Sequence, residues 1–125
     1  MDENQIATVV VDAAFKVHTT IGPGLLESVY VAALAYELRK RGLRVELERG
    51  IPAYYEEVHL DLGFRADMVV ENKVIIELKS IESLAPVHGK ILLTYLRFAD
   101  IRLGLLINFG APLIKDGIRR VVNNL

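Results

Sequence analysis

Two carboxylates and one lysine interrupt a stretch of the chain that otherwise consists of core side chains. Asp67 lies in the segment 65–70, and Glu77 and Lys79 lie in the segment 74–79. A charge inside a buried strand costs free energy unless it is paired or bound to a cation. These three residues are therefore the first candidates for a functional site.

The turn-forming residues 71–73 between the two segments predict a tight hairpin. If Asn72 lies at its centre, Asp67 faces Glu77, and Lys79 shares that face of the sheet. Two opposed carboxylates repel each other, and a cation between them would offset the repulsion. The alternative is an ion-pair network that only holds the end of the sheet together.

The oxygen atoms at this position suit a hard divalent cation such as Mg²⁺ or Mn²⁺. Asp67, Glu77 and the carbonyl group of Leu78 would be its ligands. Such an ion lowers the pKa of bound water and can hold a phosphodiester, while Lys79 orients the water or stabilises developing charge. The three residues thus point to metal-assisted phosphodiester hydrolysis.

Composition narrows the other possibilities. The chain has 125 residues, of which 52% are hydrophobic, and we expect one globular domain over residues 1–125. Fifteen basic against sixteen acidic residues give a formal charge of −1, which argues against binding nucleic acid through bulk electrostatics. The absence of cysteine excludes disulfides, thiolate zinc sites and cysteine nucleophiles. The polar, acidic N-terminus and the lack of a long apolar run predict a cytoplasmic protein without a membrane span.

Periodicity predicts the elements that position the three charged residues. Helical spacing extends over 5–19 and again from 25 to a C-cap at Gly42. Strand patterns follow, then one more helix and one buried strand. The order α-α-β-β-β-β-α-β predicts an α/β fold with a mixed central sheet flanked by helices. The predicted later elements are strands 43–48, 51–58, 64–70 and 74–80, a helix over 86–98, and a strand over 102–109, with a short final strand at 118–122 as an addition.

The spacing of Asp67, nine residues, then Glu77-x-Lys79, placed in this order of elements, resembles the PD-(D/E)XK nuclease superfamily. Residues 24–30, Gly-Leu-Leu-Glu-Ser-Val-Tyr, resemble the GxxExxY signature of a small branch of that superfamily. The resemblance continues through 35–38, the hairpin, 93–96 and 104–109. It implies a restriction-endonuclease-like core and a Mg²⁺- or Mn²⁺-dependent nuclease that cuts DNA, with RNA as the alternative substrate.

The same resemblance assigns roles to particular residues. Lys79 would be the catalytic base, and Glu27 would be the helix-borne acid that binds metal directly or through water. The alternative for Glu27 is a carboxylate that only interacts with a helix dipole. His88 and Tyr95 match the pattern H-x-x-Q-x-x-x-Y and would contact substrate.

Ile91 occupies the position of the glutamine in that pattern. This chain therefore lacks the glutamine amide and the role that the amide has in the family. This departure allows a second interpretation, a non-catalytic nuclease-fold module that binds nucleic acid or a protein partner. A domain of this size has little surface with which to hold a duplex, so a homodimer is compatible with both interpretations.

Overall fold

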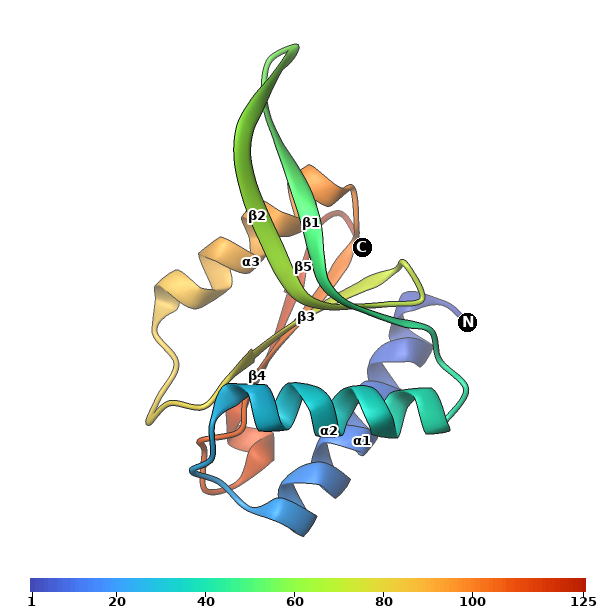
Figure 1. Cartoon of the computed structure of the whole chain (residues 1–125), viewed down its shortest axis with the longest axis vertical. Helices are drawn as coiled ribbons and strands as arrows, with labels where there is room; N and C mark the ends of the chain where they lie inside the picture. The colour runs from blue at the N-terminus through green and yellow to red at the C-terminus, as the bar shows by residue number, and fades with distance from the viewer.

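Five strands form one mixed sheet in the order β1-β2-β3-β4-β5 (Figure 1). The computed structural model describes the backbone of residues 1–125 and the side chains of all of them except Asp61 and Leu62. Only β3 and β4 pair in parallel, and α3 forms the crossover between them. The elements are α1 (Glu3–Ile21), α2 (Glu27–Lys40), β1 (Val45–Tyr55), β2 (Val58–Val70), β3 (Val74–Lys79), α3 (Pro86–Ala99), β4 (Leu103–Asn108), the 3₁₀ helix η1 (Ile114–Gly117) and β5 (Ile118–Val122).

Helices cover the sheet on both faces, which confirms the predicted α/β class. Helices α1 and α2 form the layer on one face of the sheet, and α3 forms the layer on the other. Successive side chains of β3 point alternately to these two layers. Ile76 and Leu78 pack with α1 and α2, whereas Ile75 packs with Leu92 and Leu96 of α3. The same alternation directs Glu77 toward the α3 layer.

Local sequence explains where the first two helices begin and end. Asp2 caps α1, because its side chain accepts the Gln5 N–H while the Gln5 side chain accepts the Asp2 N–H. The predicted stop at Gly42 is confirmed. Gly42 has φ +88°, and the N–H of Leu43 donates to the carbonyl of Leu38, as in a Schellman motif.

The strand order differs from the predicted one in the first half of the sheet. The expected strands 43–48 and 51–58 merge into one strand, β1, over Val45–Tyr55, while residues 56 and 57 form a turn and Val58 begins β2. The observed order is α-α-β-β-β-α-β-β. Pro52 does not break β1, because β1 is an edge strand and one side of its backbone has no sheet partner. The predicted strands 64–70 and 118–122 are present as part of β2 and as β5.

The predicted register of the second hairpin is confirmed. Val70 pairs with Val74, Val69 with Ile75 and Met68 with Ile76. Both Glu71 and Asn72 adopt φ +53° in the turn, a conformation that asparagine tolerates well.

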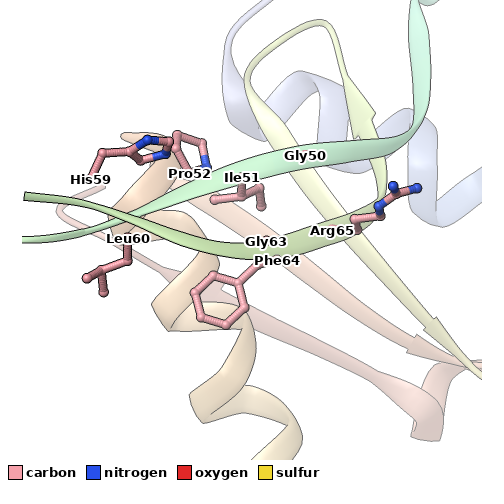
Figure 2. A pocket seen from close by; sticks show the side chains of 8 residues that line it. All are labelled: Gly50, Ile51, Pro52, His59, Leu60, Gly63, Phe64 and Arg65. Carbon is pink, nitrogen blue, oxygen red and sulfur yellow. The ribbon is translucent and has the colours of Figure 1, made fainter.

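The pairing of β1 with β2 extends much farther than the pairing of β2 with β3. Ten residue pairs join β1 to β2, against three for β2 and β3. Residues 49–66 of the two strands, here called the arm, therefore project beyond the rest of the sheet (Figure 1). Figure 2 shows Phe64 of the arm directed toward α3, where its ring contacts those of Tyr95 and Phe98.

Candidate active site

Asp67 and Glu77 come together where β2 separates from β3. The ladder of backbone hydrogen bonds ends with the pair Met68 and Ile76. Two residues farther along β3, the N–H of Leu78 donates to Oδ2 of Asp67 at 2.9 Å. The Asp67 side chain thus replaces the missing strand partner and holds its carboxylate against the C-terminal end of β3.

The backbone of β2 changes face at this point. Ala66 and Val69 both pack in the α3 layer, although regular alternation would put them on opposite faces. Across the hairpin, Glu48 has φ +50° and forms no registered pair with Asp67. A left-handed conformation is strained for glutamate, and such strain is concentrated at functional positions.

Glu77 is a buried acid with an unsatisfied oxygen. It is 9% exposed, and its Oε1 has no hydrogen-bond partner among the described residues. Burial, and then the neighbouring carboxylate of Asp67, raise the pKa of Glu77 from 4.5 to about 9, against the smaller opposing effects of the Asp67 backbone and of Lys79. At neutral pH, without a cation, Glu77 therefore keeps its proton.

The residues at this position fit a hard divalent cation. An orphaned carboxylate oxygen lies beside a second carboxylate, and a cation would satisfy both without a proton. The N–H and C=O of one strand residue point to the same neighbouring strand, so the carbonyl of Leu78 faces the gap that Asp67 fills. Among the described residues, no three His, Cys, Asp or Glu side chains gather in one group, so further ligands would be this carbonyl and water.

A small cavity of about 50 Å³ lies between Glu77 and α3. It is lined by Glu77, Lys79, His88, Ile91, Tyr95 and Leu106. Burial and then the charges of Glu77 and Asp67 raise the pKa of Tyr95. The ring of His88 is held in place, because its Nδ1 accepts the N–H of Ala85 at 2.9 Å.

The expected site residues Lys79, His88 and Tyr95 thus lie around one cavity with Glu77. A larger hollow of about 440 Å³ on the arm shares no lining residue with it (Figure 2). It is flanked by glycines and apolar side chains, with His59 and Arg65 at its ends. Of the two acids, Glu77 lines the smaller cavity together with Lys79, and neither of these residues lines the hollow on the arm.

Glu27 lies apart from this group. It is the first residue of α2, exposed, and it does not line the cavity. The start of α2 is nevertheless tied to the end of β3, because the Ser80 hydroxyl donates to the carbonyl of Leu25 at 2.5 Å. Tyr30 supports the same segment: its hydroxyl donates to the carbonyl of Gly22 at 2.6 Å, and its ring stacks on Phe109 at 4.6 Å.

Asn108 is a site-supporting residue that the sequence interpretation missed. Its buried side chain accepts the N–H groups of Ile81 and Gly110 and donates to the carbonyl of Ile81. Next to it, the N–H of Phe109 donates to the carbonyl of Lys79 at 2.7 Å. The end of β4 therefore fixes the backbone that carries Lys79. The available signal was an amide inside the almost continuously apolar run 103–109.

Comparison with known proteins adds one finding. A family model described as the PD-(D/E)XK nuclease superfamily matches residues 4–121, a range that contains both acids, Lys79 and all of α3. No curated protein and no solved structure gives a significant match.

Proposed function

This chain belongs to the PD-(D/E)XK nuclease superfamily, and from that premise we propose that it is a metal-dependent nuclease that hydrolyses phosphodiester bonds, in DNA rather than RNA. One observation carries the proposal: the buried Oε1 of Glu77 has no partner, and it lies beside Asp67 in a sheet that also places Lys79 at the same cavity. A purely structural carboxylate would have a cationic or N–H partner for that oxygen.

Mg²⁺ or Mn²⁺ would be held by Asp67, Glu77 and the carbonyl of Leu78. When bound, the cation lowers the pKa of water and offsets negative charge that develops on the phosphate. The protein's part is to fix the two carboxylates: Asp67 through the N–H of Leu78, and Glu77 through its position inside the sheet.

Lys79 is proposed as the base that takes the proton of the attacking water. As an ammonium ion it then stabilises the charge of the phosphate. His88 and Tyr95 lie on α3 across the cavity and would orient the substrate. Glu27 would assist from the start of α2 through water, which is the part of the proposal that depends on the GxxExxY resemblance.

The direct test is cleavage of DNA and RNA, single-stranded and duplex, with Mg²⁺ or Mn²⁺ and with chelator. We expect DNA cleavage that needs the cation and is lost in Lys79→Ala. Lys90→Ala is the matched control, because Lys90 is an exposed lysine of α3 that does not line the cavity. Wild-type protein that cleaves none of these substrates, or equal loss in both variants, would contradict the proposal.

A second function is favoured by Ile91. This side chain lines the cavity and is 44% exposed, in the position where the resemblance expects a glutamine. A nuclease-fold module that binds nucleic acid or a protein partner without turnover would tolerate such an apolar wall. Binding of DNA by wild type and Lys79→Ala alike, with no cleavage by either, would favour this function. A cytoplasmic location stays a prediction of the sequence; among the described residues, no helix is both long and apolar enough to cross a membrane.

A further inference from the structure

The end of the arm presents apolar side chains to solvent on both of its faces. Tyr55 and Val58 form a registered pair and are 66% and 60% exposed. On the other face, Tyr54 pairs with His59, and their rings lie 5.1 Å apart. We refer to residues 54–59 as the tip. Apolar side chains on an otherwise solvated projection indicate a contact surface.

Two glutamates form the turn of the tip. Glu56 has φ +54°, a conformation that favours glycine in a two-residue hairpin turn. Neither Glu56 nor Glu57 forms an ion pair with the described side chains. The tip therefore combines a backbone strain with two unpaired negative charges, a combination that stability alone does not explain.

A groove between α2 and β1 is apolar like the tip and has basic residues where the tip has acidic ones. Its volume is about 520 Å³, and its lining residues are Ala32, Ala35, Tyr36, Arg39, Lys40 and Leu47. Tyr36 is 70% exposed, so the groove has an apolar floor that solvent reaches. Arg39 and Lys40 form its basic rim, and neither makes an ion pair with a described side chain.

The rim is held in position for a partner. Arg39 donates to the carbonyl of Val45 at 2.8 Å, which fixes the guanidinium next to β1 and leaves further donors free. The tip and the groove of one chain are far apart, because the arm projects away from α2 along the longest axis of the molecule (Figure 1). Only another molecule can bring an acidic tip to this basic groove.

We propose that the tip of one copy of this chain inserts into the α2–β1 groove of a second copy. Tyr54, Tyr55 or Val58 then covers the apolar floor, while Glu56 and Glu57 meet Arg39 and Lys40. The formal charge of −1 leaves little net repulsion between copies. Because each copy has one tip and one groove, a two-fold dimer contains two equivalent tip-to-groove contacts and closes on itself. The proposal does not depend on nuclease activity.

Reversing the charges of the tip or of the groove tests this proposal, with self-association measured by sedimentation velocity. The variant Glu56→Lys/Glu57→Lys has a basic tip and a basic groove, and Arg39→Glu/Lys40→Glu has an acidic tip and an acidic groove. We expect each variant alone to self-associate at least about tenfold more weakly than wild type. An equimolar mixture of the two should form a heterodimer, because both of its contacts are again complementary.

The control is Glu82→Lys/Lys115→Glu, a charge exchange at exposed residues outside the tip and the groove, which should dimerise like wild type. Tyr55→Ser supplies a second variant that weakens the dimer without changing charge, and circular dichroism confirms that each variant is folded. The inference is overturned if wild type is monomeric at about 100 µM. It is also overturned if the exchanged variants dimerise normally, or if their mixture stays monomeric.

Discussion

Glu37 and Glu77 are the two buried glutamates of the described chain, and their surroundings are opposite. Glu37, 7% exposed, lies between α1 and α2 with Lys16 at 2.8 Å from Oε1 and Arg41 at 3.5 Å from Oε2. Glu77 has the carboxylate of Asp67 beside it, and one of its oxygens has no partner among the described residues. The Lys16 side chain lowers the pKa of Glu37, whereas burial and Asp67 raise that of Glu77.

The charge of Glu37 is already paired within the fold, whereas Glu77 is left to bind a proton or a cation. Arg41 also contacts Asp12 at 2.5 Å, so the Glu37 group joins the first two helices through several cations and anions. At Glu77, the neighbouring strand β2 supplies a second anion, Asp67, instead. A buried carboxylate next to another carboxylate is stable only with a proton or a metal ion between them.

The largest expected effect concerns catalysis. Glu77→Gln removes a proposed metal ligand and should lower the rate of DNA cleavage by roughly 10²–10³-fold. Glu37→Gln removes only a link between helices, so its rate per folded molecule should stay within about twofold of wild type. The measurement is cleavage at saturating Mn²⁺, with the folded fraction from circular dichroism. Similar rates for the two variants would remove the distinction between the two glutamates.

Metal ions should stabilise the protein through Glu77 but not through Glu37. A ligand that binds only the folded state adds about 2.7 kcal/mol to the free energy of unfolding at a hundredfold excess over its Kd. We expect Mn²⁺ to raise the unfolding midpoint of wild type and of Glu37→Gln, and to leave that of Glu77→Gln unchanged. Urea titration with and without Mn²⁺ measures this, and an equal response from all three proteins would place the metal elsewhere.

The pH dependence of stability should have opposite signs at the two glutamates. Between its ordinary value of 4.5 and its folded value of about 9, the pKa shift of Glu77 makes the folded state bind more protons than the unfolded state. The free energy of unfolding without metal therefore falls as pH rises in this window, by up to about 1.4 kcal/mol per pH unit.

Glu37 has a lowered pKa, so its contribution is present above the unfolded pKa and is lost as pH falls through the folded one. Chemical unfolding of the chelated protein from about pH 5 to about pH 8 measures the Glu77 effect, and extending the series below the ordinary glutamate pKa of 4.5 measures the Glu37 effect. Glu77→Gln should flatten the fall with rising pH, whereas Glu37→Gln should keep it and lose the weakening on the acid side. An unchanged slope in Glu77→Gln would show that Glu77 titrates normally.

The sequence was sufficient to predict the elements that depend on local patterns. Helical spacing located α1, α2 and α3, and the turn centred on Asn72 predicted the β2–β3 register. The length of the arm was not predictable, because its turn is formed by Glu56 and Glu57 rather than by glycine or asparagine, the residues that usually mark hairpins.

Tertiary contacts determine what the sequence could not show about the site. The spacing of Asp67, Glu77 and Lys79 identified the acids and the lysine, but the role of Asn108 depends on a loop from another part of the chain. The position of Glu27 depends on how the start of α2 packs against the end of β3. The pairing of Glu37 with Lys16 likewise requires α1 to pack against α2, which no local pattern specifies.

The smallest effect that we expect concerns Ile91, which lines the cavity beside Glu77. Ile91 is 44% exposed, so Ile91→Gln should change the free energy of unfolding little. If catalysis already proceeds with the isoleucine, an added amide beside Glu77 and Lys79 contributes at most one hydrogen bond to substrate or water, which corresponds to about a two- to tenfold change in rate. If cleavage appears only in Ile91→Gln, the wild-type chain is the binding module. Val87→Gln, an exposed change on α3 outside the cavity, is the control in the same cleavage assay.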